Sequence, residues 1–293
     1  MRKNADFSIE VPGKWVLSGE HSVLRGKRAI AFPHLEVSLV LNYREQKSFS
    51  ITASPFYSPV KKLIGRACEF LEKDPNLFSF GEIDIQSTIP VAAGLGSSAA
   101  LSVAMAKLAI WKTGSSLDQW IPLATHLEDV FHGKSSGMDV NVIAKGVPIV
   151  FSMERGPEKI PQLEALPHFE LFDSSRRSST KLCIEKVKEW RDAQPECSQE
   201  WDDKMGASTE SAFSALLSFS KASCKNERID SELELAHAIN SAQDCFEKWG
   251  LVSAELLDQK EELLKQGALA VKLTGAGLGG FWVALWPSST PHA

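Results

Sequence analysis

One segment limits what this chain can fold into: Ser97–Trp111 is apolar nearly all the way round when it is drawn as a helix. Only serine residues and Lys107 interrupt the apolar surface, and Gly114 follows as a stop. A helix without a polar side has to be covered by protein from every direction. The rest of the chain must therefore supply that cover, and 293 residues with 43% hydrophobic side chains are enough to do so.

Short strands and amphipathic helices are predicted on both sides of this segment. Alternating runs predict strands, and apolar residues three and four positions apart predict helices. Before residue 160 the expected strands are 7–11, 15–18, 36–41, 48–53, 82–87 and 147–152, and the expected helices are 59–72 and 117–132. After it, helices are expected at 180–193, 205–224, 232–249 and 253–265, and strands at 169–172, 268–273 and 281–286. The pattern indicates an α+β fold.

A stretch with several prolines separates the two parts. Pro157, Pro161 and Pro167 lie between the strand expected at 147–152 and the first element of the second part. Prolines are typical of connections between elements. We therefore predict two domains, residues 1–160 and residues 161–293.

The loop before the apolar helix suits a polyphosphate. It runs Pro90-Val-Ala-Ala-Gly-Leu-Gly-Ser-Ser-Ala-Ala100, from a predicted strand to the start of the helix. Gly94 and Gly96 allow the backbone to approach a ligand closely and to adopt positive φ angles. The helix start adds unpaired N–H groups and the positive end of its dipole, and two serines add hydroxyls for phosphate oxygens or a metal ion. The residues expected to bind a nucleotide are Pro90, Gly94, Leu95, Gly96, Ser97, Ser98 and Ala99.

Two other interpretations of this loop stay open. Gly94-Leu-Gly96-Ser-Ser-Ala99 matches the loose dinucleotide pattern G-x-G-x-x-A. That mechanism requires a second parallel strand that ends in an acid, and a second helix is predicted there instead. The other interpretation is a plain helix start whose glycines serve packing. A P-loop is excluded, because no Gly-Lys-Ser/Thr follows the glycines.

A second glycine loop, Lys272-Leu-Thr-Gly-Ala-Gly-Leu-Gly-Gly280, lies between two apolar predicted strands. It matches G-x-G-x-x-G as well, but no helix follows, so the dinucleotide mechanism does not apply. A glycine-rich hairpin turn is the simplest alternative. Glycine costs conformational entropy, and this loop holds more glycine than a turn needs. We expect the loop to lie close to a ligand or to another stretch of backbone.

Two acids follow the apolar helix. In the helix expected at 117–132, Glu128 falls in the middle of an apolar face that begins at Leu117, where a carboxylate is costly unless it meets a cation. A bound Mg²⁺ would be such a cation, and a structural salt bridge is the alternative. Asp139 follows His132-Gly-Lys-Ser-Ser-Gly-Met at the start of another short helix. It could cap that helix or accept a proton from a substrate hydroxyl.

Charge and cysteine content argue against several other classes. The net charge is -5, so nothing draws the chain as a whole to nucleic acid or to a membrane surface. No apolar run is long enough to span a bilayer, and the charged segment Met1–Glu10 does not have the pattern of a signal peptide. The five cysteines are scattered and odd in number, which favours a reducing, cytoplasmic setting.

The first part of the chain joins these motifs into a family pattern. Val11-Pro-Gly-Lys-Trp-Val-Leu-Ser-Gly-Glu-His-Ser-Val-Leu-Arg-Gly26 resembles the first motif of the GHMP kinases, and Gly19-Glu20-His21 is most similar to its form in mevalonate kinases. The two glycine loops resemble the second and third motifs of the family. Glu128 and Asp139, around His-Gly-x-x-Ser-Gly-x-Asp, resemble its metal-binding and catalytic acids. Three motifs in this order make the resemblance specific.

The resemblance implies a two-domain fold, with an N-terminal domain like domain 2 of ribosomal protein S5 and a ferredoxin-like C-terminal domain. It also implies an enzyme that uses ATP and Mg²⁺ to phosphorylate the primary hydroxyl of (R)-mevalonate. Lys14 and Asp139 would be the catalytic pair, and Ser98 and Glu128 would hold Mg²⁺. The residues implied on the substrate side are Glu20, His21, Gly137, Thr180, Gly275, Ala276 and Gly277. A homodimer stays open.

Three other functions remain alternatives: two are kinases with a different substrate, and one is not catalytic. Phosphomevalonate kinase is one, and a kinase of homoserine or of a sugar is another. A catalytically inactive homologue that binds a metabolite is the third, and the presence of Lys14, Glu128 and Asp139 together argues against it.

The chain departs from the family pattern at a few positions. Ser135 stands where a proline is usual, and Val140 stands where an asparagine is usual. Leu278 interrupts a run of glycines in the third motif. The segment Asp173–Lys181 is similar to the Arg/Ser/Thr segment on the substrate side of the family, with its arginines in an uncertain register. These differences bear on the substrate more than on the class of reaction.

Overall fold

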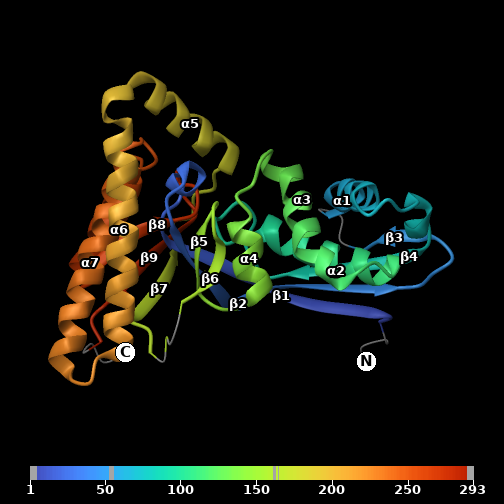
Figure 1. Ribbon diagram of the computed structural model, residues 1–293, viewed down its shortest axis with the longest axis horizontal. Coiled ribbons are helices and arrows are strands. Elements are labelled where there is room, and N and C mark those ends of the chain that lie inside the picture. The colour runs from blue at the N-terminus through green and yellow to red at the C-terminus, as the bar shows by residue number, and fades with distance from the viewer. Residues whose placement is uncertain (1–4, 53–55, 161–162, 164, 289–293) are drawn as a thin grey trace. The chain divides into compact units, whose positions relative to one another are not determined.

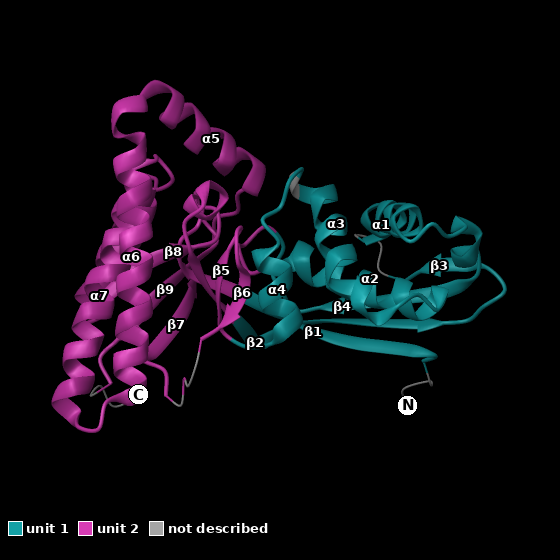
Figure 2. Cartoon of the chain, in the orientation of Figure 1, with its two compact units in different colours: residues 1–14, 33–91, 96–147 teal, residues 15–32, 92–95, 148–293 magenta. Residues whose placement is uncertain are grey.

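The computed structural model describes residues 5–52, 56–160, 163 and 165–288 (Figure 1). The chain forms two compact units, which Figure 2 colours separately. Unit 1 comprises residues 1–14, 33–91 and 96–147, and unit 2 comprises residues 15–32, 92–95 and 148–293. The strands β1 (Phe7–Ser18) and β2 (Ala29–Arg44) each contribute residues to both units. The domain boundary expected between residues 160 and 161 stays a prediction, and Pro161 lies outside the described residues.

Unit 1 packs helices against strands. β4 (Gly81–Ser87) pairs antiparallel with the end of β2 and parallel with β3 (Phe49–Ile51). The helices are α1 (Tyr57–Phe70), α2 (Ser97–Thr113), α3 (Trp120–His132) and α4 (Met138–Lys145), with 3-10 turns at Pro75–Phe78 and Leu117–Gln119. α2 packs against α1, α3 and α4. Every residue from Ala99 to Ala106 is buried, so the helix that is apolar all round is covered as its sequence requires.

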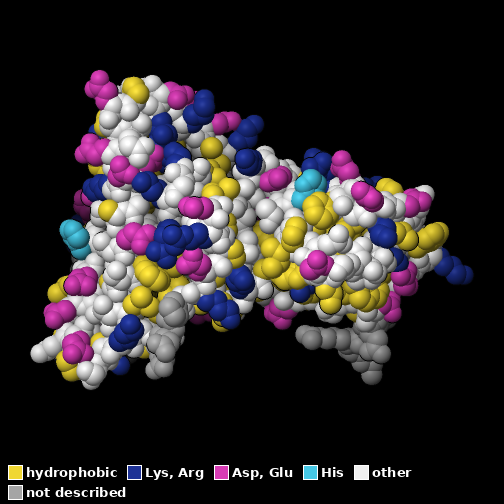
Figure 3. Space-filling model, viewed as in Figure 1, with side chains coloured by type: hydrophobic (Ala, Val, Ile, Leu, Met, Phe, Trp, Pro, Cys, Tyr) yellow, Lys and Arg dark blue, Asp and Glu magenta, His cyan; other side chains and the backbone are white. Residues whose placement is uncertain are grey.

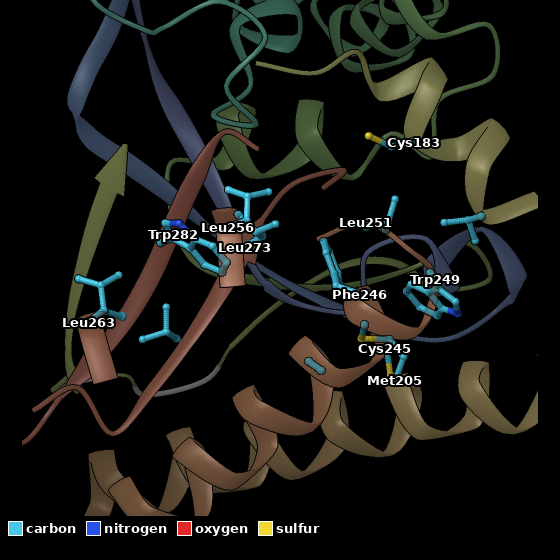
Figure 4. Close-up of a cluster of buried hydrophobic side chains, with 14 of the residues drawn as sticks. Cys183, Met205, Cys245, Phe246, Trp249, Leu251, Leu256, Leu263, Leu273 and Trp282 are labelled. Atoms are coloured by element: carbon cyan, nitrogen blue, oxygen red, sulfur yellow. The ribbon is translucent and has the colours of Figure 1, made fainter. Parts of the chain in front are cut away.

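Unit 2 is built on an antiparallel sheet in the order β7 (His168–Asp173), β9 (Phe281–Trp286), β8 (Ala270–Thr274). Its other elements are the 3-10 helix η1 (Ser22–Arg25), β5 (Ile149–Ser152), β6 (Gly156–Lys159), α5 (Thr180–Ala193), α6 (Pro195–Lys221), α7 (Lys225–Lys248) and α8 (Ala254–Lys265). α6 and α7 pack along each other (Figure 1). Phe246, Trp249 and Leu251 are fully buried in a core that also holds Leu273 and Trp282 (Figure 4).

Most predicted elements are confirmed, and the differences have physical reasons. The strands expected at 7–11 and 15–18 form one strand, β1, that continues through Pro12. α6 begins at Pro195 rather than at residue 205. The sequence pattern missed its first turns because they bury polar residues, Ser198 and Asp202, and so lack an apolar period. Leu117 is 77% exposed, because it lies in a 3-10 turn rather than on the buried face of α3.

The surface carries charges of both signs. Figure 3 shows lysine and arginine side chains interspersed with aspartate and glutamate over the face in view. No helix among the described residues combines the length and the apolar character needed to cross a membrane. All five cysteines are free thiols.

Candidate active site

The start of α2 offers N–H groups to an anionic ligand. Gly96 is the N-cap, in the left-handed conformation with φ 79° and ψ 28°. The Ala100 N–H donates to the Gly96 carbonyl at 2.8 Å, so the N–H groups of the three residues between them have no acceptor within the helix. The helix runs for 17 residues, which aligns its peptide dipoles toward this end. Leu95 and Ala99, which the sequence predicts to bind a nucleotide, have buried side chains. These two residues can therefore bind a ligand only through their backbone.

Lys14 lies directly against the N-cap of α2. A Cβ atom added to Gly96 would stand 2.7 Å from Lys14 Cγ and 3.2 Å from Ile143 Cδ1, so only glycine fits. The Lys14 Nζ lies 2.9 Å from Asp139 Oδ2. The Lys14 side chain is 4% exposed and that of Asp139 is 33% exposed. Unit 1 therefore joins a buried cation, an accessible acid and a helix N-terminus, and the contact between Lys14 and Asp139 is the one that the family resemblance implies.

Asp139 is not the cap of its helix. Gly137 is the N-cap of α4, at φ 80°, and Asp139 lies in the first turn. The Ser136 hydroxyl accepts a bond from the Met138 N–H at 3.2 Å, and the Asn141 side-chain amide donates to the Gly137 carbonyl at 2.9 Å. The capping alternative is therefore wrong. The start of α4 is instead held by the Ser136 hydroxyl and the Asn141 amide, which leaves the Asp139 carboxylate for its contact with Lys14.

Glu128 is buried on α3, as the apolar face of that helix predicts. It is 2% exposed. The Ser98 hydroxyl donates to Glu128 Oε1 at 2.7 Å, and the Ser102 hydroxyl donates to Oε2 at 2.9 Å. Both serines belong to α2, so α2 and α3 together build a cluster of oxygen atoms two residues beyond the Gly96 N-cap.

These oxygen atoms fit a Mg²⁺ ion. Mg²⁺ takes hard oxygen ligands and is commonly held in kinases by one or two protein side chains together with substrate phosphates. Ser98 and Glu128 supply such a partial set, and the N–H groups beside them suit the phosphates. Among the described residues no group of three or more His, Cys, Asp or Glu could hold a metal without a ligand's help.

In unit 2, Glu20 forms a buried ion pair. Lys272 Nζ donates to Glu20 Oε1 at 2.5 Å and to the Leu273 carbonyl at 2.7 Å. The side chains of Lys272 and Glu20 are 1% and 5% exposed. Lys272 also lies over the Phe246 ring, 4.4 Å from its centroid. The two charges come from the first and third motifs, and each offsets part of the cost of burying the other.

His21 is buried, neutral and fixed in one tautomer. Its Nε2 lies 2.8 Å from the Ala276 carbonyl oxygen. Because a carbonyl can only accept, Nε2 carries the proton and Nδ1 is the acceptor. The pKa of His21 is lowered from 6.5 to about 4. Burial is the largest cause, the bond to Ala276 opposes it, and the positive charges of Arg25 and Lys272 add to the lowering.

The third-motif loop packs backbone against backbone on the loop at residues 92–95. A Cβ atom added to Gly275 would stand 2.8 Å from Gly94 Cα, and one added to Gly280 would stand 2.6 Å from the Ala93 carbonyl oxygen. The Ser178 hydroxyl donates to the Gly277 carbonyl at 2.5 Å. Gly275 and Gly280 are therefore explained by another stretch of backbone, which is one of the two expectations for this loop, whereas Gly277 faces the Leu251 side chain.

The two arginines of the segment after β7 each form an ion pair. Arg176 lies 2.6 Å from Glu255, and Arg177 lies 2.7 Å from Asp173. Both arginines and Glu255 line a hollow of about 520 Å³ together with Ser174, Ser175, Gln259 and Leu278. Thr180 is half-buried at the first position of α5.

Comparison with known proteins decides the family. Residues 62–146 match the model of the GHMP kinases N terminal domain. Over 303 aligned residues the chain is 30% identical to the mevalonate kinase of Thermococcus gammatolerans, and the match covers 94% of this chain and 88% of that protein. The chain belongs to the GHMP kinase family.

The fold of this GHMP kinase is that of solved mevalonate kinases. The Methanococcus jannaschii mevalonate kinase has a TM-score of 0.74 at 20% identity, over 98% of this chain and 92% of that chain. The L. major mevalonate kinase, solved in complex with R-mevalonate, has a TM-score of 0.74 at 21% identity, over 97% and 88% of the two chains. At these identities the likeness shows the fold alone. It confirms the α+β GHMP kinase fold predicted from the sequence.

Three departures of this GHMP kinase from the family pattern have local consequences. The Ser135 N–H, which a proline would lack, donates to Asp129 Oδ1 at 2.7 Å and so ties the loop before Asp139 to α3. Val140 is fully buried, and the amide of the next residue, Asn141, bonds the Gly137 carbonyl. Leu278 adopts a positive φ of 58°, with its N–H donated to the Leu251 carbonyl at 2.7 Å.

Sequence reasoning missed several residues that support the site of this GHMP kinase. Asp129 holds the loop before Asp139, Lys272 pairs with Glu20, and Asp202 pairs with two arginines. The motif letters contain Lys272, but its partner lies 252 positions away. No spacing rule along the chain could have found that contact.

Proposed function

We propose that this GHMP kinase transfers the γ-phosphoryl group of ATP to the primary hydroxyl of (R)-mevalonate. The contact between Lys14 Nζ and Asp139 Oδ2, 2.9 Å long and beside the α2 N-cap, carries the proposal. Phosphoryl transfer asks a protein to position its substrates and neutralise charge rather than to form covalent bonds. A buried lysine, an accessible acid and a helix N-terminus meet those needs. The archaeal relatives that bear the name mevalonate kinase supply the acceptor.

Asp139 accepts the proton of the attacking hydroxyl. Its side chain is one-third exposed, so it can reach a substrate, whereas Lys14 is held inside the protein. A carboxylate within hydrogen-bond reach of a hydroxyl both orients it and removes its proton as the new P–O bond forms. The Lys14 ammonium fixes the carboxylate and offsets negative charge on the transferring group.

The start of α2 holds the nucleotide phosphates. Its N–H groups and dipole attract the negative charge, and Gly96 lets the backbone approach. Ser98 and Glu128 would hold Mg²⁺, which neutralises phosphate oxygens when it is bound. In its bond to Glu128 the Ser98 hydroxyl is the donor, and a hydroxyl that donates can also coordinate through its oxygen lone pairs.

Glu20 and His21 bind the acceptor alcohol, together with the loop at residues 275–277. His21 presents Nδ1 as an acceptor for a hydroxyl, because its Nε2–H is used by Ala276. Gly137 and Thr180 are further proposed contacts on the substrate side. A neutral His21 avoids placing one more positive charge beside Lys272 and Arg25.

A reducing, cytoplasmic setting belongs to the same proposal. All five cysteines are free, and three of them, Cys68, Cys183 and Cys245, are buried in the two units. Disulfides form in oxidising compartments, so free buried thiols suit a reducing one.

A coupled ADP-release assay tests the function. The purified chain is offered mevalonate, phosphomevalonate, homoserine and galactose in turn, with Asp139→Asn as the background control. Mevalonate is expected to give the highest kcat/KM. A preference for another acceptor would refute mevalonate as the substrate but would still support phosphoryl transfer as the reaction. Absence of acceptor-dependent ADP release with all four would overturn the transfer itself.

A further inference from the structure

His21 has a backbone conformation that few residues adopt. Its φ is 59° and its ψ is -49°, and the Ser22 N–H donates across it to the Glu20 carbonyl at 2.6 Å. Three residues with this bond form a γ-turn, and the form with a positive φ at its centre is rare and strained. Such a conformation persists only where the surrounding structure imposes it. The residues that impose it here therefore decide where the His21 imidazole lies.

One side of the turn is fixed by the first and third motifs themselves. Glu20 is bound to Lys272, and the His21 imidazole is bound to the Ala276 carbonyl. These contacts hold the residue before the turn and the side chain at its centre. The start of η1 is bonded to the chain before the turn, since the Val23 N–H donates to the Gly19 carbonyl at 3.0 Å. The last residue of η1, Arg25, is held from another element.

The other side is fixed by an acid that belongs to none of the motifs. Arg25, the last residue of η1, donates from Nε to Asp202 Oδ2 at 2.7 Å and from Nη2 to Asp202 Oδ1 at 2.5 Å. This two-bond geometry is the most directional ion pair available to an arginine. Asp202 lies on α6 and is 1% exposed, and Arg191 of α5 also donates to its Oδ2. Two helices thus hold the acid in place.

Arg25 continues this contact to the imidazole. Its guanidinium carbon lies 5.9 Å from the centroid of the Trp249 ring. Trp249 is fully buried, and its ring meets the His21 ring edge-on at a centroid distance of 5.8 Å. Phe246 closes another side of His21 at 6.0 Å. The order of contact is Asp202, Arg25, Trp249 and His21, all of them within unit 2.

We propose that Asp202 is a positioning residue for the substrate site: through its two bonds to Arg25 it keeps His21 in the strained γ-turn, with Nε2–H directed at Ala276 and Nδ1 left to accept a substrate hydroxyl. Asp202 itself does not touch the substrate. The effect on mevalonate rests on the proposed function, whereas the effect on the imidazole does not.

The imidazole is tested first, without any substrate. Long-range ¹H–¹⁵N NMR spectra distinguish a fixed Nε2–H tautomer from an averaged ring, and the spectrum of His21→Gln identifies the His21 signals. Wild type should show the fixed tautomer. Asp202→Asn should replace it with averaged or shifted signals. Asp203→Asn is the matched control, because Asp203 is the next residue of α6 and pairs with Lys27 at the surface.

The kinetics are tested next, at saturating concentrations of the second substrate. Asp202→Asn should raise KM for mevalonate about tenfold, which corresponds to about 1.4 kcal/mol. KM for ATP should stay within about twofold. A uniform loss of folded enzyme would change kcat and neither KM, so a rise in KM for mevalonate alone distinguishes positioning from misfolding. Asp202→Glu, which keeps the charge, should restore part of the loss. Asp203→Asn should behave as wild type.

Arg25→Gln covers the case in which Asp202→Asn does not fold. It leaves Asp202 paired with Arg191, so no buried carboxylate is stranded. It should produce the same change in the His21 signals and the same selective rise in KM. Unchanged His21 signals in a folded Asp202→Asn or Arg25→Gln protein would overturn the proposal, and so would equal rises in KM for ATP and mevalonate. Absence of activity toward mevalonate in wild type would refute the proposed function, and the NMR comparison would still decide the role of Asp202.

Discussion

Replacing Gly96 by alanine tests whether the start of α2 sets the position of Lys14. The added methyl group would lie 2.7 Å from Lys14 Cγ and 3.2 Å from both Lys14 Cε and Ile143 Cδ1. Ordinary contact begins at 3.4 Å, so Lys14 Cγ has to retreat by about 0.7 Å, which is 3.4 minus 2.7. The Lys14 Nζ is bonded to Asp139 at 2.9 Å, so a shift of this size lengthens or turns that bond.

Gly114 provides the matched control at the other end of the same helix. It has a φ of 63° against 79° for Gly96, and an added Cβ would meet nothing within 4 Å. Alanine in this left-handed region costs about 1–2 kcal/mol at either position. Gly114→Ala should therefore lower Tm by about 2–4 °C. Gly96→Ala should lower it by at least as much, since its methyl group also has to displace Lys14. Only Gly96→Ala should also lower kcat, by about 10- to 100-fold, because a misplacement of about 1 Å can cost about 10² in rate.

The assay is kcat at saturating ATP and mevalonate for wild type and both variants, with melting curves recorded alongside. The decisive quantity is the difference between the two alanine variants, since the backbone cost is common to both. If Gly96→Ala is as active as Gly114→Ala, the contact with Lys14 does not control the catalytic pair. A fall in kcat that follows Tm in both variants would assign the loss to folding.

Three further predictions concern the acids and the histidine. Asp139→Asn should lower kcat by about 10² to 10⁴. In the double variant with Lys14→Met the two losses should be less than multiplicative, because the two side chains act on each other. A near wild-type kcat in a folded Asp139→Asn protein would remove Asp139 from the mechanism. Glu128→Gln should raise the Mg²⁺ concentration needed for half-maximal activity, because a hard anionic ligand is lost, and an unchanged requirement would make Glu128 a structural acid. His21 has a folded pKa of about 4 against 6.5 as its ordinary value, so the unfolded chain binds more protons in that interval and the free energy of unfolding should fall as pH drops from 6.5 to 4. The contribution lost is at most about 3 kcal/mol, and denaturant titrations of wild type and His21→Gln at pH 7.5 and pH 5 measure it, since the variant should lose less between the two pH values.

Local pattern was enough to predict the parts of the fold that local physics determines. α2 is apolar all round and is buried on every side from Ala99 to Ala106, and the periodicity of α3 correctly placed Glu128 inside the protein. α5 has the bounds expected from its sequence, Thr180 to Ala193, because Ser179 caps it with a bond from the Leu182 N–H. Strong caps and uniform apolar faces are signals that a short window contains.

Contacts between distant segments could not be predicted in the same way. Asp202 lies in a polar stretch, and it is buried only because Arg25 and Arg191 neutralise it from other elements. The motifs contain both Glu20 and Lys272, but the sequence does not say that they pair. The resemblance to a family implied that Lys14 and Asp139 pair, and the contact is present, but no spacing along the chain indicates it.

The packing of the loop at residues 92–95 on the third-motif loop has a consequence for how this enzyme can evolve. Gly94 meets Gly275, and the Ala93 carbonyl meets Gly280, through main-chain atoms alone. A weakened contact between side chains can be repaired by a second substitution across the interface. Here the opposing atoms belong to the main chain of Gly94 and Ala93, so no exchange of side chains at these positions would make room for a larger residue at Gly275 or Gly280. A larger residue at Gly275 or Gly280 would require the opposite backbone to move, so few substitutions at these two positions are compatible with the fold.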